Sequence, residues 1–146
     1  MRKASTGEAG KTFQIVMAVR DYELDQYGVV NNAVYNNYLE HTRHDFLTLV
    51  GIDAAAVAAQ GRSLALSRLT VQYRASLRSK DNFQVRLRVS AMSGARVTFY
   101  QEIHKLPELQ LMLEAWAEAV FLDERGRPMR LSPEHREMFL PYLMTA

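Results

Sequence analysis

The chain has 146 residues, 48% of them hydrophobic and 23% charged, a balance that predicts one soluble globular domain and excludes a disordered chain. Lys and Arg number 18 against 16 acidic residues, so the net charge of +2 gives no support for nucleic-acid binding but is compatible with an anionic ligand. The absence of cysteine excludes a disulfide framework, a thiolate metal site and a cysteine nucleophile.

The N-terminal residues 1–11 are polar and rich in small side chains, so we expect a flexible tail before a single domain over residues 12–146. The tail has no apolar core of the kind found in signal peptides. No apolar run approaches the ~20 residues that span a bilayer, and we therefore expect a soluble cytoplasmic protein that does not bind a membrane. Apolar and polar residues alternate from Thr12 to Val19, which predicts the first strand.

The stretch from Arg20 to Gly51 organises the rest of the chain. It begins as a polar turn with three acids and continues as a helical pattern that Gly51 is expected to end. At 3.6 residues per turn, one mostly apolar face of this helix carries Asn32, Tyr35, Leu39, Arg43, Phe46 and Val50. Asn31 or Asn32 is the expected N-cap. Asp25 thus lies just before a helix start, where free N–H groups and the helix dipole can hold a developing oxyanion.

The same stretch contains a motif of fixed spacing, Asp25-x-x-Gly28-Val29-Val30-x-Asn32-x-x-Tyr35-x-x-Tyr38-x-Glu40. This motif resembles the signature of hotdog-fold acyl thioesterases of the 4-hydroxybenzoyl-CoA thioesterase type. The Asn31-Asn32 pair is similar to the acyl-acyl-carrier-protein thioesterases of plants and their bacterial relatives. The resemblance covers Phe13 to about Met138 and implies an antiparallel sheet wrapped around the helix at residues 32–50.

The middle of the chain reads as one short helix and three strands. Asp53 to Gln60 predicts the helix, with Asp53 as its N-cap and Gly61 at its end. A polar break at residues 74–81 and a turn at Ser93-Gly94 separate the three predicted strands, which are Ser63–Tyr73, Phe83–Val89 and Val97–His104.

The segment from Leu109 to Leu122 gives conflicting signals. Its Leu, Met, Glu and Ala content favours a helix by intrinsic propensity, but its small and apolar residues also alternate with larger or charged ones. Because the resemblance implies that the sheet ends here, we predict a strand. Ser132 as N-cap and Pro133 as first helical residue then predict a short final helix that stops near Pro141.

The predicted order of elements is an α+β arrangement, with one long helix and an antiparallel sheet. Pattern alone does not separate a hotdog fold from a cystatin-like cone, and the motif before the helix favours the hotdog fold. The resemblance also implies a homodimer with joined sheets, or a tetramer of two such dimers. Active sites would lie between protomers, so that a phosphate-binding loop and Asp25 can come from different chains.

Asp25 is the predicted catalytic residue. In the thioesterases that the motif resembles, the acid at this position is a nucleophile or a general base for water, and backbone N–H groups at Asn32 and Ala33 would polarise the thioester carbonyl. The alternative is that Asp25 only caps the turn. Asn32 stands where several bacterial relatives carry histidine. Its amide can orient water or a carbonyl but cannot relay protons.

The resemblance further implies an acyl pocket beside the helix. Its predicted lining consists of Gly28, Val29, Ala33, Tyr35, Leu39, Arg43 and Ser67. Aromatic and aliphatic residues at helical spacing are, however, more often plain core. The Arg43 guanidinium needs an acceptor such as Asp25, Glu40 or a substrate carbonyl, unless its side chain extends to solvent.

A basic cluster of Arg74, Arg78 and Lys80 lies in the break at residues 74–81. These side chains can bind the phosphates of coenzyme A, or the phosphopantetheine and acidic helix of acyl carrier protein; a solvated basic loop is the alternative. His41 and His44 lie one turn apart beside acids, but the chain has no His-Glu-x-x-His, and we expect no metal site. It also lacks the motifs of serine hydrolases and nucleotide-binding enzymes.

We therefore expect hydrolysis of an acyl thioester, carried on coenzyme A or acyl carrier protein, to a carboxylic acid and a thiol, within fatty acid or polyketide metabolism. No cofactor is expected beyond the coenzyme A or phosphopantetheine of the substrate. One alternative is a hydratase or dehydratase of β-hydroxyacyl thioesters, which would need a histidine–acid pair. The other is a non-catalytic module that binds acyl thioesters, which would not require Asp25.

Overall fold

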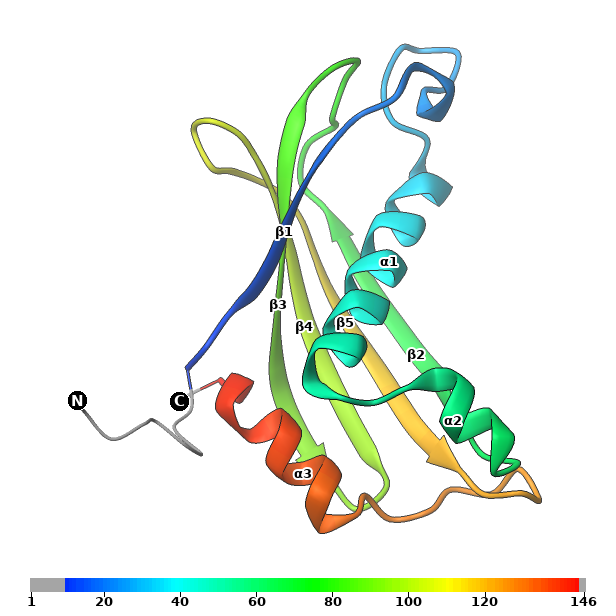
Figure 1. The fold of residues 1–146 in the computed structure, drawn as a ribbon. Coiled ribbons are helices and arrows are strands. Elements are labelled where there is room, and N and C mark those ends of the chain that lie inside the picture. Colours follow the sequence, from blue (N-terminus) through cyan, green and yellow to red (C-terminus); the bar gives the residue numbers. More distant parts are fainter. Residues whose placement is uncertain (1–9, 145–146) are drawn as a thin grey trace.

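The computed structural model describes residues 10–144; residues 1–9 of the expected tail lie outside the described part, as do residues 145 and 146. Five antiparallel strands form one sheet in the order β1-β3-β4-β5-β2 (Figure 1). The strands are β1 (Phe13–Ala18), β2 (Ser63–Tyr73), β3 (Asn82–Ser93), β4 (Arg96–Lys105) and β5 (Gln110–Leu122). Every strand predicted from the sequence is confirmed, and β3 and β4 extend beyond their predicted ends.

The helices lie where capping residues predict them. In chain order they are a 3-10 turn at Asp21–Glu23, α1 (Asn32–Val50), α2 (Ala54–Ala59), α3 (Pro133–Phe139) and a 3-10 turn at Leu140–Tyr142. Asn31, not Asn32, is the N-cap of α1, because its side-chain oxygen accepts from the Ala33 N–H at 2.8 Å. Gly51 ends α1 with φ of 97°, a left-handed conformation that glycine adopts at little cost.

The segment with conflicting signals is strand β5. It pairs with β4 on one side and β2 on the other, so both edges of its backbone form ladder hydrogen bonds. Its small side chains from Leu113 to Ala119 alternate into the core, while Glu114, Trp116 and Glu118 lie on the opposite face. Central position in the sheet thus overrides the helical propensity of the segment.

Helix α1 lies across one face of the sheet (Figure 1), and buried hydrophobic side chains from the helix and the sheet form the core between them. Near the start of α1, Tyr35 and Leu39 are buried among side chains of the sheet and the loop before β3. Near its end, the Phe46 ring lies 5.9 Å from Phe99 and 6.2 Å from Phe139, so α3 closes the same core. This arrangement confirms the predicted α+β hotdog layout and fixes both ends of α1 on the sheet.

The two ends of the described chain meet. The N–H groups of Gly10 and Lys11 donate to the carbonyls of Leu143 and Pro141 at 3.1 and 2.9 Å. Within residues 10–144, no helix is long and apolar enough to cross a membrane.

Candidate active site

The loop before α1 holds Asp25 in a defined position. One oxygen of its carboxylate, Oδ1, accepts from the Tyr27 N–H at 2.8 Å and more weakly from the Val29 N–H at 3.4 Å. The Asp25 backbone N–H donates to the Val29 carbonyl, and Gly28 supplies a positive φ of 78° at the turn. Among the described residues, no hydrogen bond involves Oδ2. The side chain is therefore held by one oxygen and is partly exposed, with the other oxygen available to a reactant.

The start of α1 offers one free backbone donor near this loop. The Ala33 N–H is engaged by the Asn31 side chain, and the Val34 N–H donates to the Asn31 carbonyl at 2.8 Å. In the described part of the chain, no acceptor contacts the Asn32 N–H. An antiparallel bridge joins Leu24 to Val30 and closes the loop that holds Asp25, and Asn32 follows two residues after this bridge. The Asn32 side chain is exposed and does not cap the helix.

The loop is anchored to α1 through a buried carboxylate. Glu23 is only 7% exposed, and its oxygen Oε1 accepts from the Tyr38 hydroxyl at 2.7 Å and from the Arg20 N–H at 2.9 Å. Its backbone carbonyl accepts from the Asn31 N–H at 3.0 Å. Burial, assisted by the hydrogen bond to Glu23, raises the pKa of Tyr38. Glu23 therefore links the Asp25 loop, the helix cap and the helix body.

The basic break at residues 74–81 lies directly beside the Asp25 loop in the same chain. The Val30 N–H donates to the Leu77 carbonyl at 2.9 Å, and Val29 forms an isolated antiparallel bridge with Arg78. The Ser79 hydroxyl donates to Asp21 at 2.8 Å. The structure thus brings the predicted base and part of the predicted phosphate-binding cluster together within one protomer.

The three basic residues of this break differ in their surroundings. Arg74 donates to Glu114 and Gln72, and hydrogen bonds from Tyr100 and Arg74 lower the pKa of Glu114. Arg74 is therefore already engaged in an ion pair on the far side of the sheet from α1. The side chains of Arg78 and Lys80 are exposed, and the Arg78 N–H donates to the Asp81 carboxylate at 2.8 Å.

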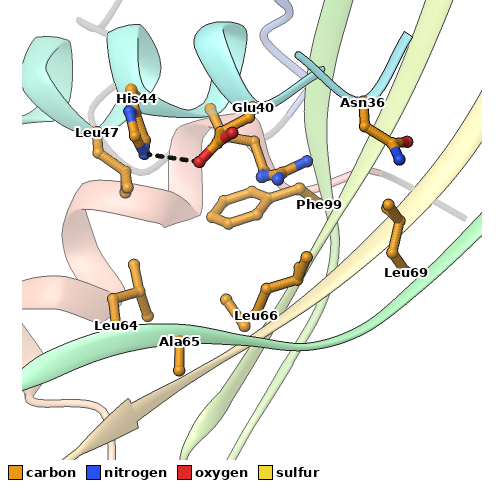
Figure 2. Close-up of a pocket in the computed structure, with 11 residues that line it drawn as sticks. Asn36, Glu40, His44, Leu47, Leu64, Ala65, Leu66, Leu69 and Phe99 are labelled. Atoms are coloured by element: carbon orange, nitrogen blue, oxygen red, sulfur yellow. Dashed lines mark ion pairs between the residues drawn. The ribbon is translucent and has the colours of Figure 1, made fainter. Parts of the chain in front are cut away.

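A cavity of about 310 Å³ lies between α1 and β2 (Figure 2). Side chains of α1 line one wall, β2 lines the opposite wall, and Phe99 and Ala119 come from the sheet. The full lining is Asn36, Glu40, Arg43, His44, Leu47, Leu64, Ala65, Leu66, Leu69, Phe99 and Ala119. The cavity therefore has a polar side on the helix and an apolar side on the strands, which suits the burial of an apolar group that carries a polar end.

Arg43 supplies the half-buried charge of this cavity. Its guanidinium donates to the Gln101 side-chain oxygen at 3.0 Å, and the Gln101 amide donates in turn to the Leu39 carbonyl at 3.0 Å. Burial lowers the pKa of Arg43, and the nearby charge of Glu40 opposes this shift. The guanidinium is thus fixed by the fully buried Gln101 rather than extended into solvent.

The other predicted pocket residues have separate locations. Tyr35 and Leu39 are 2% and 0% exposed and form part of the core, where the Tyr35 hydroxyl accepts from the Leu77 N–H at 2.9 Å. Both side chains face the sheet rather than the cavity. The α1 residues that face β2 belong to the next stripe of the helix, which includes Asn36, Glu40 and Leu47. Ser67 is exposed at a bulge of β2, and its hydroxyl donates to the Glu118 carbonyl at 3.2 Å.

The two histidines of α1 each lie near an acid one turn away on the helix. The His41 Nε2 lies 3.4 Å from the Asp45 carboxylate, and the His44 Nε2 lies 3.9 Å from the Glu40 carboxylate. Within residues 10–144, no group of three or more His, Cys, Asp and Glu side chains is arranged to hold a metal ion.

Arg43 was predicted to line the pocket and does line the cavity, but sequence reasoning missed the other α1 residues of its wall. Asn36, Glu40 and Leu47 recur with Arg43 at intervals of three or four residues, beside the core stripe that begins at Asn32. A search for a second, mixed polar and apolar face on the same helix would have found it. The buried Gln101 had no sequence signal, because its role depends on the pairing of β4 opposite α1.

Comparison with known proteins agrees with the fold. A sequence model of the thioesterase-like superfamily matches residues 19–139, and the chain belongs to this family, a class of thioester hydrolases. The chloroplastic acyl-acyl carrier protein thioesterases ATL3 and ATL2 of Arabidopsis thaliana are 48% and 46% identical to it. The matches cover 89% and 94% of this chain and 68% and 72% of those proteins.

Solved structures share the fold at lower sequence identity. Slr0204, a 1,4-dihydroxy-2-naphthoyl-CoA thioesterase from Synechocystis, superimposes with a TM-score of 0.82 at 18% identity. The match covers 88% of this chain and 96% of that one. This likeness confirms the hotdog fold.

Proposed function

We propose that the protein hydrolyses an acyl thioester carried on coenzyme A or acyl carrier protein, with Asp25 as the base or nucleophile. The observation that carries this proposal is the position of Asp25. Its Oδ1 is held by backbone N–H groups, and among the described residues neither Oδ2 nor the N–H of Asn32, two residues after the bridge that closes the loop, has a hydrogen-bond partner. This is the pairing of a carboxylate with an oxyanion donor that acyl transfer requires.

The reaction needs one water and no redox partner. With Asp25 as base, the carboxylate removes a proton from water, and the water oxygen attacks the thioester carbon. The Asn32 N–H stabilises the negative charge that develops on the carbonyl oxygen. The carbon–sulfur bond then breaks, the thiolate takes the proton, and a carboxylic acid is released. With Asp25 as nucleophile, its carboxylate attacks the thioester carbon, the carbon–sulfur bond breaks and a thiolate leaves as an acyl–aspartyl anhydride forms. Water then hydrolyses the anhydride, which restores the Asp25 carboxylate and releases the carboxylic acid, and the remaining proton goes to the thiolate.

The carrier of the acyl group reaches the site over the basic break. Arg78 and Lys80 are exposed beside the Asp25 loop and suit the phosphates of coenzyme A or phosphopantetheine. Arg74 does not belong to this set, since Glu114 already engages it. The identity to acyl-acyl carrier protein thioesterases supports a protein-bound acyl group as substrate.

We also propose a homodimer, as the sequence resemblance implies. Strand β2 ends the sheet and, within residues 10–144, pairs only with β5, so its other edge is open to a second copy. The cavity between α1 and β2 borders this edge. A second copy paired there would complete the wall of the acyl site. A tetramer of two such dimers is the larger assembly that the resemblance implies.

The test is thiol release from coenzyme A and carrier-protein thioesters of several acyl groups. Release by the wild-type protein supports the proposal, and the preferred carrier follows from the same panel. Binding of acyl thioesters without release would instead support a non-catalytic module.

One observation favours a second function, the hydration of an unsaturated acyl thioester. Glu40 and His44 both line the cavity and lie 3.9 Å apart, which is the kind of acid–histidine pair that a hydratase needs. This reading predicts loss of the enoyl absorbance on incubation with an enoyl thioester. It also predicts that Glu40→Gln abolishes the change while thiol release remains.

A further inference from the structure

The backbone of Leu77 joins the basic break at residues 74–81 to the start of α1 at two points. Its carbonyl accepts from the Val30 N–H, and its N–H donates to the Tyr35 hydroxyl, both at 2.9 Å. The Leu77 side chain is 0% exposed and belongs to the same core cluster as Val30 and Tyr35. Both backbone groups of Leu77 are therefore fixed by the chain around the helix start, immediately before Arg78.

Tyr35 is the part of α1 that reaches the basic break. Its ring is 2% exposed and lies edge-on to the rings of Tyr38 and Tyr73, with centroids 6.0 and 5.7 Å away. Within the described part of the chain, no other α1 side chain forms a hydrogen bond with the break. Burial raises the pKa of the Tyr35 hydroxyl, and the hydrogen bond from Leu77 opposes this shift. The hydroxyl is therefore neutral at pH 7 and accepts from the break at a position that the neighbouring rings hold.

Arg78 follows Leu77 in the chain and lies beside the Asp25 loop. Its backbone forms an isolated antiparallel bridge with Val29. The Val29 carbonyl accepts from the Asp25 N–H at 2.8 Å, and the Val29 N–H donates weakly to the Asp25 carboxylate at 3.4 Å. The exposed Arg78 side chain is thus carried by a backbone segment that pairs directly with the loop holding the candidate base. A shift of this segment changes the separation between Arg78 and Asp25.

We propose that Tyr35 is a positioning residue, which holds the basic break so that a carrier phosphate bound by Arg78 places the thioester at Asp25. This inference rests on the proposed thioesterase function and adds the residue that couples binding of the carrier to the chemistry. Tyr35 is buried in the core and acts only through the backbone of Leu77. Because a reactant must be held close to its productive geometry, a small shift of the bound phosphate relative to the carboxylate lowers kcat/KM.

The test compares two carriers of the same acyl group. Coenzyme A thioesters carry the phosphates, whereas thioesters of N-acetylcysteamine reproduce only the sulfur end of the pantetheine arm. Tyr35→Phe removes the acceptor of the Leu77 N–H and keeps the ring. We expect KM for the coenzyme A thioester to rise at least about threefold, with kcat/KM for the N-acetylcysteamine thioester changed by less than about twofold. An equal loss for both carriers in the folded variant, or no loss for either, would overturn the inference.

The matched control is Tyr73→Phe, which removes a hydroxyl from the ring that packs against Tyr35. Tyr73 is 48% exposed, and within residues 10–144 its hydroxyl forms no hydrogen bond. Both carriers should give wild-type kinetics with this variant. A loss confined to the coenzyme A thioester in Tyr73→Phe would show that ring packing, and not the hydrogen bond, positions the break, and would overturn the inference.

A double variant tests whether Tyr35 acts through Arg78. If it does, KM for the coenzyme A thioester in Tyr35→Phe/Arg78→Ala should stay within about twofold of KM in Arg78→Ala alone, because the two changes remove one effect. A KM raised by the product of the two separate effects would overturn the inference.

A measurement on the wild-type protein tests the same contact if Tyr35→Phe does not fold. Hydrogen exchange followed by NMR shows whether the Leu77 N–H is held before any ligand binds. This N–H should exchange as slowly as the amides of the central strand β4. Exchange at the rate of an exposed loop would overturn the inference.

Failure of the proposed function gives a different result. If the wild-type protein releases no thiol from either carrier, calorimetry with free coenzyme A still measures binding at the basic break. Weaker binding by Tyr35→Phe, with wild-type binding by Tyr73→Phe, supports the positioning role without turnover. Equal binding by all three proteins overturns it.

Discussion

The buried hydrogen bond between Tyr38 and Glu23 is predicted to hold the Asp25 loop against α1. Tyr38→Phe removes the hydroxyl that donates to Glu23 at 2.7 Å and leaves the ring in the core. Hydrogen bonds to charged groups contribute about 1.5–3 kcal/mol, and both partners are almost fully buried. The free energy of unfolding should fall by about this amount, which corresponds to a melting temperature roughly 5–10 °C lower for a domain of this size.

The pH dependence of this loss follows from the raised pKa of Tyr38. A tyrosine whose pKa is higher in the folded state contributes stability that is complete below its unfolded pKa of about 10. That contribution is lost as the pH rises from there toward the folded pKa. Urea unfolding, followed by circular dichroism, should therefore show the full difference at pH 7 and a shrinking difference above about pH 10.

The matched control is Tyr27→Phe, which removes a hydroxyl from a side chain that is 77% exposed. Its unfolding free energy should change by less than about 0.5 kcal/mol. If Tyr38→Phe behaves like Tyr27→Phe at pH 7, the contact with Glu23 does not hold the loop and the reasoning is refuted.

Three further predictions concern the carrier, the turn and the cavity. Arg78→Ala should raise KM for coenzyme A thioesters several-fold and reduce the salt dependence of kcat/KM. Arg74→Ala should do neither. Equal effects of the two substitutions would contradict the proposal that Arg78, and not Arg74, binds the phosphates of the carrier. Gly28→Ala should lower the free energy of unfolding in urea by about 1 kcal/mol, because the φ of Gly28 is 78° and alanine is strained there. No atom lies within 4 Å of an added Cβ, so a steric clash adds nothing to this loss. An unchanged free energy of unfolding would show that the turn relaxes. Gln101→Leu should lower stability by about 1–3 kcal/mol, since it leaves the Arg43 guanidinium without its acceptor, and an unchanged urea midpoint would show that Arg43 finds another.

Local signals in the sequence predicted most of the fold. Caps at Asn31, Asp53 and Ser132, and glycine after α1, placed the helix ends to within one residue. Period-two alternation placed β1, β3 and β4. The segment of β5 was the exception, because its composition favours a helix and only its pairing on both edges makes it a strand. That pairing is a long-range property, and the family resemblance supplied it.

The candidate site was less accessible to sequence reasoning. The motif located Asp25 and the helix start. It did not show that the Asn31 side chain, as the N-cap, accepts from the Ala33 N–H and so takes this donor away from a substrate carbonyl. The stripe at Tyr35 and Leu39 faces the core, so the cavity belongs to the neighbouring stripe of α1. The engagement of Arg74 could not be foreseen either, since Glu114 lies 40 residues away and reaches it only through the β2–β5 register.

The proposed hydrolysis of acyl thioesters depends most directly on the chemical role of Asp25. Asp25→Asn keeps an oxygen that can accept from the Tyr27 N–H, so the turn is preserved while the basic and nucleophilic carboxylate is lost. The control is Asp21→Asn, the same change in the same loop, at a residue that contacts Ser79. The measurement is thiol release from the best acyl thioester of the panel. We predict that kcat falls by about 10²–10⁴ in Asp25→Asn and stays within about twofold of wild type in Asp21→Asn. Full turnover by a folded Asp25→Asn protein would show that Asp25 is a turn residue and would contradict the account.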